Sequence, residues 1–321
     1  MVFLSIIKAS SFPPDNHVSL RIDEANATLG LMGLRELQGG LTVTCQPSLE
    51  AFFKTSALAI TPNYVVKKFD ARENGWLTHE MFHHWIDSNN KRDQHLRVSA
   101  PVSVKHLGAC CKFIRLGADN DFGVYILPRY RGRHPGCSFG DISKIQSLVK
   151  TPNLFSKDFC SSAPRMKYLD DYCEFLKSQP CEKIAKALLV DNCRKFLLEN
   201  ARPFLSNQVT HVDLHQHNLV FFNLGVTAID IESLKLGSDA ITKSVLSLRF
   251  LYKLASLSHP HFEHARELII ENAEEFRSAV IQDIGWRFAV VIQRMVKTKN
   301  DDYRFELFKH VYYLKFLNKL W

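Results

Sequence analysis

Side chains that can transfer protons or hold metal ions are concentrated between residues 211 and 232, which read HVDLHQHNLVFFNLGVTAIDIE. Asp213 is followed five positions later by Asn218 and twelve positions after that by Asp230. Two apolar runs, LVFF and VTAI, lie between Asn218 and Asp230, and the Asn-Leu-Gly between them can form a hairpin turn. A hairpin would bring Asp230 back beside Asn218, so an amide oxygen and a carboxylate could share a hard cation such as Mg²⁺.

Asp213, at the mouth of the same loop, could then accept a proton from a substrate hydroxyl. A carboxylate that orients the nucleophile and two oxygen ligands that hold metal on phosphates are the groups that phosphoryl transfer needs. A second interpretation places four alternating residues on one face of a strand as a catalytic zinc or two-metal site of a hydrolase: His211, Asp213, His215 and His217. That interpretation leaves the downstream hairpin without a role. A solvated loop is the third interpretation.

The elements that must position this loop change in type along the chain. Five short runs in the first half are enriched in branched and aromatic residues and predict strands: LTVTC (41–45), AFFKTSALAI (51–60), YVVKKF (64–69), CKFIRL (111–116) and GVYILPRY (123–130). A helix pattern, WLTHEMFHHWID (76–87), interrupts them. After Gly132, apolar residues recur at steps of three and four, which predicts a helical half with two short strands inserted at 219–231.

HVDLHQHN resembles the HxDxxxxN catalytic loop of the aminoglycoside phosphotransferase and choline kinase group, which has a protein-kinase-like fold. The later segment AIDIE (228–232) resembles the metal-binding segment of that group. The resemblance implies an α+β, bilobal fold. A nucleotide-binding N-lobe, residues 1–128, would hold a small antiparallel sheet and one helix. A larger helical C-lobe, residues 129–321, would carry the catalytic loop and the acceptor pocket.

The resemblance also implies roles for individual residues of the loop. Asp213 would be the catalytic base, Asn218 and Asp230 would bind Mg²⁺, and His211 would brace the loop. The protein would then be a kinase that uses ATP to phosphorylate a hydroxyl group. Val212 departs from the pattern, because the group usually has glycine there, and a β-branched residue restricts the backbone. A non-catalytic, nucleotide-binding pseudokinase is the alternative on the same fold.

A kinase-like fold also requires a lysine on a strand and a glutamate on the following helix. YVVKKFD offers Lys67 and Lys68, which face opposite sides of a strand. We expect Lys67 to be the nucleotide-binding lysine, because it directly follows the apolar pair Val65-Val66, and Glu80 to be its partner.

The remaining nucleotide contacts are assigned to loops. There is no GxGxxG, so the phosphate-covering loop is either Gly39-Gly40 or the turn Gln46–Leu49, and the second contains Ser48. The run GVYILPRYRG resembles the hinge strand of the group, in which the backbone of Leu127 to Arg129 would meet adenine.

The overall composition indicates which ligands, metals and surroundings suit the protein. The net charge of +8 suits an acidic or phosphorylated ligand, and it would equally suit nucleic acid or an anionic membrane surface. Together with the kinase resemblance it disfavours a polycationic antibiotic, so we expect a small-molecule or glycan hydroxyl as acceptor and no nucleic acid. The eight cysteines contain no CxxC pair, which disfavours structural zinc. The opening MVFLSII is a poor signal peptide, so a cytoplasmic protein is expected. The basic, aromatic helix at the C-terminus is expected to dock on the helical lobe, and a peripheral membrane contact is its second interpretation.

Overall fold

The computed structural model describes residues 28–37, 40–72, 75–92, 96–156, 208–222 and 225–269 of the 321-residue chain. These residues belong to two compact units, one within Met1–Asp87 and Val98–Gly132 and the other within Ser88–Arg97 and Arg133–Trp321. Strands predominate in the described part of the first unit and helices in that of the second, as the sequence predicts. The predicted domains 1–128 and 129–321 stay a prediction.

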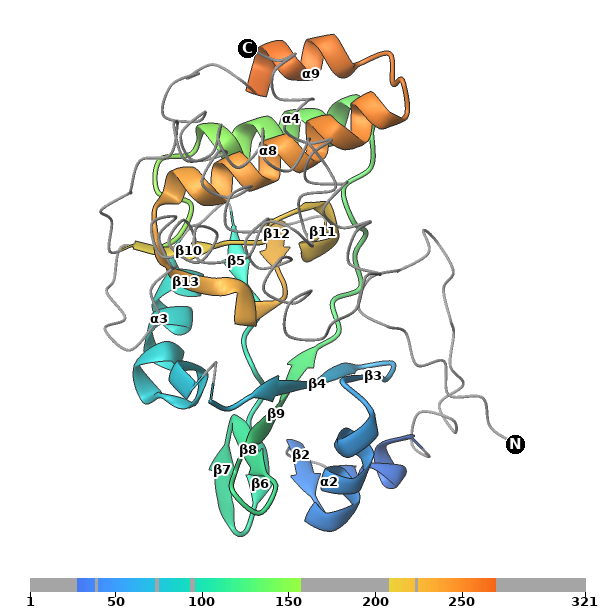
Figure 1. The fold of residues 1–321 in the computed structure, drawn as a ribbon, viewed down its shortest axis with the longest axis vertical. Helices are drawn as coiled ribbons and strands as arrows, with labels where there is room; N and C mark the ends of the chain where they lie inside the picture. Colours follow the sequence, from blue (N-terminus) through green and yellow to red (C-terminus); the bar gives the residue numbers. More distant parts are fainter. Residues whose placement is uncertain are drawn as a thin grey trace, which may run out of the picture. The chain divides into compact units, whose positions relative to one another are not determined.

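The described part of the first unit contains two four-stranded sheets, with the strand orders β1-β2-β6-β7 and β3-β4-β9-β8 (Figure 1). The strands are β1 (Leu34–Leu37), β2 (Gly40–Val43), β3 (Leu58–Ile60), β4 (Tyr64–Asp70), β6 (Val104–His106), β7 (Ala109–Cys111), β8 (Phe113–Leu116) and β9 (Phe122–Pro128). A short strand, β5 (Arg97–Val98), precedes β6. The pairing is antiparallel except between β2 and β6, which are parallel.

Helices α2 and α3 connect strands of these sheets along the chain. Helix α2 (Gln46–Thr55) joins β2 to β3, and α3 (Glu80–Lys91) follows β4 after the 3-10 turn η1 (Gly75–Thr78). The helix predicted at residues 76–87 is therefore present, but its first residues form the 3-10 turn.

Helix α2 corrects the strand predicted at residues 51–60, because only Leu58–Ile60 is extended. Pro47 lies in the first turn of α2, where its missing N–H costs no helical hydrogen bond. Leu49 and Phe53, one helical turn apart, are both fully buried in the core of this unit, together with Val66 of β4. The apolar run is thus the buried stripe of a helix.

The second unit carries the residues of the predicted catalytic loop. Strand β10 (Gln208–His211) pairs antiparallel with β13 (Leu234–Gly237), and β11 (Leu219–Phe222) pairs antiparallel with β12 (Gly225–Ala228). The 3-10 turns η2 (Gln216–Asn218) and η3 (Ile231–Ser233) lie between them along the chain. Helices α4 (Phe139–Lys150), α8 (Asp239–Ser256) and α9 (Phe262–Ile269) pack against one another, and α8 also packs against β10 (Figure 1).

Serine caps determine where helices α4 and α8 begin. The hydroxyl of Ser138 accepts from the N–H of Asp141 at the start of α4, and that of Ser238 accepts from the N–H of Ala240 at the start of α8. An N-cap of this type stabilises a helix by about 1 kcal/mol. Because Ser238 directly follows β13, α8 begins immediately beside the β10–β13 pair.

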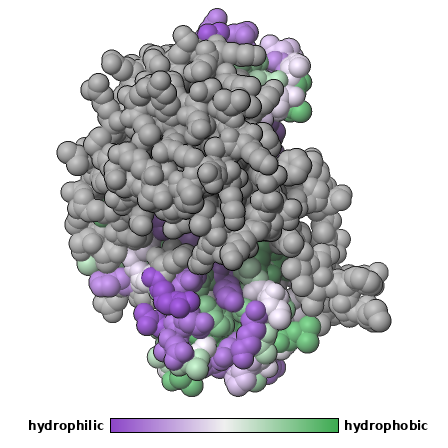
Figure 2. All heavy atoms as spheres, in the orientation of Figure 1, coloured by the Kyte–Doolittle hydropathy of each residue, from purple (hydrophilic) through white to green (hydrophobic). Residues whose placement is uncertain are grey.

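On the face shown in Figure 2, hydrophilic and hydrophobic residues are interspersed over the described part of the first unit. Its large exposed hydrophobic side chains include Leu31, Leu37 and Leu107. Within the described residues, no helix has both the length and the hydrophobicity that crossing a membrane requires. The terminal helix for which docking or membrane contact is predicted lies outside the described residues.

Candidate active site

The hairpin predicted between Asn218 and Asp230 is present, so that prediction is confirmed. Leu219 pairs with Ala228 across β11 and β12, and the N–H of Ile229 donates to the carbonyl of Asn218 at 2.9 Å. Asn218 therefore lies opposite Ile229, the residue directly before Asp230. The pairing register of the hairpin thus positions both expected metal ligands at one end of it.

His211 braces the loop from inside the protein. Its side chain is buried, its Nε2 lies 2.8 Å from the carbonyl oxygen of Ile229, and its Nδ1 accepts from the N–H of Asp213 at 3.3 Å. A carbonyl oxygen can only accept and an amide N–H can only donate, so the imidazole is neutral with its proton on Nε2. His211 thereby ties the predicted catalytic loop to the end of β12, which is the bracing role expected of it.

The backbone of Asp213 is fixed while its side chain remains accessible. The carbonyl oxygen of Asp213 accepts from the N–H of His215 at 2.9 Å and from Nδ2 of Asn218 at 2.8 Å. The side chain is 30% exposed, and its Oδ2 lies 3.7 Å from Nε2 of His215. A carboxylate on an anchored, partly exposed loop can accept a proton from a bound hydroxyl.

Asn218 and Asp230 offer oxygen atoms that suit Mg²⁺. Because Nδ2 of Asn218 donates to the carbonyl of Asp213, the side-chain oxygen occupies the other branch of the amide. Asp230 adopts the left-handed conformation, with φ 66° and ψ 57°, and its Oδ2 accepts from the hydroxyl of Ser233 at 2.7 Å. A non-glycine residue held in this region is strained, which is common at functional sites. Amide and carboxylate oxygens are ligands that Mg²⁺ accepts, so the donor set fits this ion.

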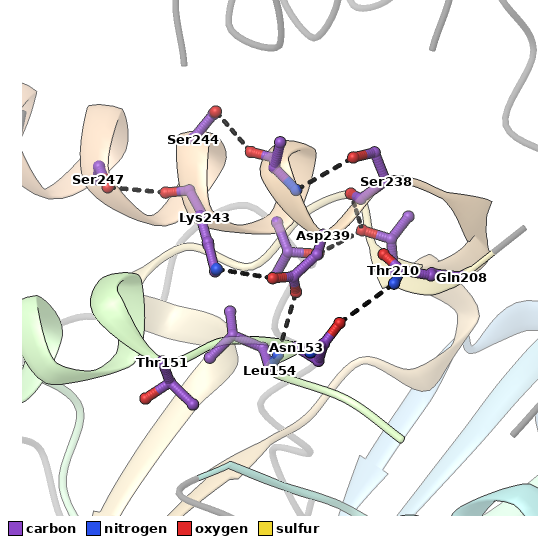
Figure 3. A network of polar contacts seen from close by, with 12 residues as sticks. Thr151, Asn153, Leu154, Gln208, Thr210, Ser238, Asp239, Lys243, Ser244 and Ser247 are labelled. Carbon is purple, nitrogen blue, oxygen red and sulfur yellow. Dashed lines mark hydrogen bonds and ion pairs between the residues drawn. The ribbon is translucent and has the colours of Figure 1, made fainter. Parts of the chain in front are cut away.

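A chain of hydroxyl groups links β10, the strand that leads into the predicted catalytic loop, to α8 (Figure 3). The N–H of His211 donates to Oγ1 of Thr242 at 2.9 Å, and Oγ1 of Thr210 donates to the carbonyl of Ser238 at 2.9 Å. The two threonine hydroxyls also bond to each other. Since the proton of Thr210 is used on Ser238, Thr242 must be the donor in that bond. The chain therefore runs from β10 through α8 to the cap of α8.

The same network extends to the loop after α4 (Figure 3). Asp239, the first residue of α8, forms an ion pair with Lys243 at 2.8 Å and accepts from the N–H of Leu154 at 3.2 Å. Gln208 at the start of β10 donates to Oδ1 of Asn153 at 3.2 Å. No pattern in the sequence predicts the network as a whole, because its members are far apart along the chain. The one local signal was the Ser-Asp pair before an amphipathic run, which predicts a helix cap.

Val212 stands where the aminoglycoside phosphotransferase and choline kinase group usually has glycine, and its side chain packs the loop on α8. It is buried in a hydrophobic cluster with Ile241 and Val245. Its N–H donates to the carbonyl of Ser233 at 2.9 Å. A valine is therefore accommodated where the group usually has glycine, because its side chain packs on the helix that supports the strand.

In the first unit, Lys68 points towards α2. Its Nζ donates to the carbonyl of Phe53 at 2.8 Å and lies 4.4 Å from the centre of the Phe122 ring. Adjacent residues of a strand face opposite sides, so Lys67 points to the other face of the sheet. Lys68 therefore has a structural role on the α2 side.

The face that carries Lys67 is the one that α3 covers. Lys67 pairs with Tyr125 across β4 and β9, and Tyr125 pairs with Phe113 across β9 and β8, so the three share a face. The ring of Phe113 lies 4.9 Å from that of His83 in α3. Glu80 is the first residue of α3. This placement supports Lys67 over Lys68, while the pairing of Lys67 with Glu80 stays a prediction.

The turn on which the assignment of Ser48 rests is part of a helix. The segment Gln46–Leu49 is predicted as a turn before a strand, but it is the first turn of α2, and the hydroxyl of Ser48 donates to Sγ of Cys45 at 3.1 Å. The other candidate is at the β1–β2 hairpin, where Leu37 pairs with Gly40 and the backbone of Gly40 has φ 125°. Gly39 lies outside the described residues. Both candidates for the phosphate-covering loop, and Ser48 as a nucleotide contact, stay predictions.

The predicted hinge offers few N–H groups. Leu127 is buried at the end of β9, and Pro128 after it has no N–H. The N–H of Arg129 donates to the carbonyl of Asn63 at 2.8 Å, and its guanidinium donates to the carbonyl of Thr61 at 3.3 Å. Two of the three hinge residues can therefore offer adenine only carbonyl oxygens.

The interpretation of the histidines as a metal site does not fit this geometry. Strand β10 ends at His211, so Asp213, His215 and His217 do not alternate on a strand face. Both ring nitrogens of His211 are committed to Ile229 and Asp213, and a metal would have to displace one of these bonds. Among the described residues, which include all four of these side chains, no group of three or more His, Cys, Asp or Glu is arranged to hold a metal ion.

No protein-family model matches the sequence. No curated protein sequence matches it either.

The structure is, by contrast, similar to solved structures. Aminoglycoside 2′-phosphotransferase-IIIa in its GDP complex matches with a TM-score of 0.51 and 11% identity, over 82% of this chain and 89% of that one. An amicoumacin kinase in complex with AMP-PNP and Ca²⁺ matches with a TM-score of 0.49 and 13% identity, over 90% and 92% of the two chains. A choline kinase from Streptococcus pneumoniae matches with a TM-score of 0.45 and 14% identity, over 80% and 88%. The first of these shows that the chain has an α+β, protein-kinase-like fold, and the fold prediction is confirmed.

Proposed function

We propose that this protein is a kinase that transfers the γ-phosphoryl group of ATP to a hydroxyl of a small molecule or glycan. The observation that carries the proposal is the geometry of the HxDxxxxN loop. Its histidine and its backbone are committed to hydrogen bonds, whereas Asp213 presents a partly exposed carboxylate. The hairpin that follows positions Asn218 and Asp230 at its open end. On a kinase-like fold, this set of groups is suited to phosphoryl transfer.

The reaction needs little covalent chemistry from the protein. The acceptor hydroxyl gives its proton to Asp213, and its oxygen forms a bond to the γ-phosphorus. The bond between that phosphorus and the bridging oxygen breaks, and ADP leaves with the electron pair. Mg²⁺ held by Asn218 and Asp230 would neutralise negative charge on the phosphates.

The proposed nucleotide contacts come from the first unit. Lys67 is assigned to the phosphates, with Glu80 as its partner on α3. The backbone at Leu127 and Arg129 is assigned to adenine, and the committed N–H of Arg129 implies recognition through carbonyl oxygens. Ser48 remains a further assigned contact. The GDP in aminoglycoside 2′-phosphotransferase-IIIa supports a nucleotide as the phosphoryl donor.

We further propose a neutral or phosphorylated sugar as the acceptor, including a sugar of a cell-surface glycan. The net charge of +8 supports it over a polycationic antibiotic. The basic stretch 129–134 adds less support for a sugar acceptor, because the guanidinium of Arg133 is already bonded to the carboxylate of Asp141, at 2.5 and 2.7 Å. Burial would raise the pKa of Asp141, but hydrogen bonds from Arg133 and Gly136 lower it overall, so the pair is charged. The resemblance places the acceptor pocket at the insert between residues 140 and 200, with KYLDDYCEFLKS (167–178) at its centre, and this central segment lies outside the described residues.

A screen for ADP release tests the proposal. The full chain would be incubated with ATP, Mg²⁺ and each of a panel of aminoglycosides, choline, ketosamines, nucleosides and core sugars. Removing a general base typically costs on the order of 10² to 10⁴ in rate, so Asp213→Asn should abolish turnover while leaving ATP binding intact. Wild-type turnover in that variant would refute the assignment of the base. Turnover of aminoglycosides and of no sugar would refute the choice of acceptor.

A non-catalytic nucleotide-binding protein is the second candidate. The observations that favour it are the position of Ser48 inside α2 and the committed N–H of Arg129, which leave fewer groups for the nucleotide. A thermal shift with ATP and Mg²⁺ followed by the ADP assay separates the candidates. At 100 times its dissociation constant, a ligand stabilises the folded state by about 2.7 kcal/mol. A shift that depends on Mg²⁺ without turnover on any acceptor would favour this candidate over the kinase.

A further inference from the structure

Four histidines in the described residues accept a hydrogen bond at Nδ1 from the backbone N–H two residues further along. The pairs and their distances are His79 with Met81 (3.4 Å), His211 with Asp213 (3.3 Å), His215 with His217 (3.1 Å) and His259 with His261 (3.2 Å). An amide N–H can only donate, so Nδ1 holds a lone pair in each case. The proton of the neutral imidazole is then on Nε2, and the contact of Nε2 determines what each ring does.

His215 differs from His211 in what faces Nε2. Nε2 of His215 lies 3.7 Å from Oδ2 of Asp213, and the two side chains are 22% and 30% exposed. In His211 the same atom is used on the carbonyl of Ile229. The Nε2–H of the His215 ring therefore lies beside the carboxylate that the proposed function assigns as the base.

The backbone holds both members of this pair in place. The N–H of His215 donates to the carbonyl of Asp213 at 2.9 Å, and the carbonyl of His215 accepts from the N–H of Asn218 at 2.8 Å. His215 is also the N-cap of η2, because its ring accepts from the N–H of His217. With Nδ1 fixed in this way, the ring cannot turn its N–H away from Asp213 without losing the cap.

We propose that His215 is a positioning residue for the base, a role that rests on the proposed function. Its Nε2–H holds Oδ2 of Asp213 and so selects the orientation in which the other carboxylate oxygen meets the acceptor hydroxyl. A separation of 3.7 Å is longer than a hydrogen bond. Contacts of this kind commonly tighten when the substrate binds. A small error in the placement of a reacting group lowers the rate steeply.

Two substitutions separate the positioning role from the cap. In His215→Asn, the side-chain oxygen is as many bonds from Cβ as Nδ1 is in histidine, so it can still cap His217, but no N–H reaches Asp213. In His215→Gln, the amide nitrogen is as many bonds from Cβ as Nε2 is, so a donor towards Asp213 is restored and the cap is lost. The matched control is His259→Asn, which changes a histidine with the same cap geometry at the start of α9.

Steady-state kinetics with the best acceptor from the ADP screen and melting temperatures would be measured for the full chain and the three variants. We expect His215→Asn to keep the melting temperature and both KM values while kcat falls about 10- to 100-fold. His215→Gln should recover most of kcat despite a lower melting temperature. His259→Asn should keep kcat.

The outcomes distinguish this proposal from the one on which it rests. An active wild type with an equally active His215→Asn variant would overturn the positioning role and leave the kinase assignment standing. So would a kcat that follows the melting temperature across all three variants, because a purely structural role predicts that correlation. A wild type that turns over no acceptor would overturn both.

Discussion

Replacing Thr242 by valine would remove the hydroxyl through which α8 bonds to β10 while nearly preserving the shape of the side chain. Thr242 accepts from the N–H of His211 at 2.9 Å and donates to the hydroxyl of Thr210. Thr242 and Thr210 are 0% exposed and His211 is 1% exposed, so solvent does not replace the lost group. Thr210 keeps the carbonyl of Ser238 as the acceptor of its own proton.

The expected cost follows from the group that loses its partner. A buried N–H left without an acceptor costs about 1–3 kcal/mol. For a chain of this size, a loss near the middle of that range lowers the melting temperature by about 2–4 °C. The same N–H belongs to the residue whose ring holds the backbone of Asp213. A displacement of the base by about 1 Å can cost about 100-fold in rate, so we expect kcat to fall at least about tenfold.

Differential scanning fluorimetry and the ADP assay would measure both effects at one temperature. Thr242→Ser is the matched control, because it keeps the hydroxyl and removes only a methyl group. We expect this variant to retain kcat within a factor of a few and to lose less stability than Thr242→Val. A valine variant as stable and as active as the wild type would refute the reasoning that the hydroxyl chain holds the catalytic strand.

Three further predictions concern residues that the structure places clearly. Lys67→Ala should lower kcat/KM for ATP at least about tenfold with little change in melting temperature. Lys68→Ala should mainly lower the melting temperature, because Lys68 bonds to α2. ATP titrations and melting curves check both variants. Burial, with the nearby charge of Lys112, lowers the pKa of His83 to about 4 from 6.5. Its contribution to stability is therefore complete above pH 6.5 and is lost as the pH falls towards 4, so melting temperatures should fall less over this range in His83→Gln than in the wild type. Val212→Gly should lower the free energy of unfolding by about 2–3 kcal/mol in urea titrations, from lost burial and added backbone freedom, and an unchanged value would contradict its packing on α8.

The geometry of the HxDxxxxN loop and of the hairpin after it could be predicted because it is local. Asp213 and Asn218 are five residues apart, and the return of the chain to Asp230 depends on a hairpin whose turn residues are visible in the sequence. The choice of Lys67 over Lys68 was likewise a local argument, which the strand register now supports. The strand predicted over residues 51–60 was wrong because a short apolar run fits a buried strand and a buried helix equally well.

Other features depend on contacts that no local pattern contains. Thr210 and Thr242 lie on different elements, and only the packing of α8 on β10 brings their hydroxyls together. The use of the Arg129 N–H depends on the loop at Asn63, more than sixty residues earlier in the chain. Neither threonine is unusual for a strand or a helix, so the sequence offered no reason to select it.

The histidines of the strip illustrate why residue type alone is a poor guide to chemistry. A run with three imidazoles and a carboxylate suits transition metals by composition. In the structure, however, Nδ1 of His211 and of His215 is occupied by a backbone N–H, and zinc binding at those atoms would have to break bonds that shape the loop. The imidazoles instead determine where the backbone runs and where Asp213 points. Carboxylate and amide oxygens are then the groups that the strip offers to a reaction, and these suit a hard cation and a hydroxyl proton.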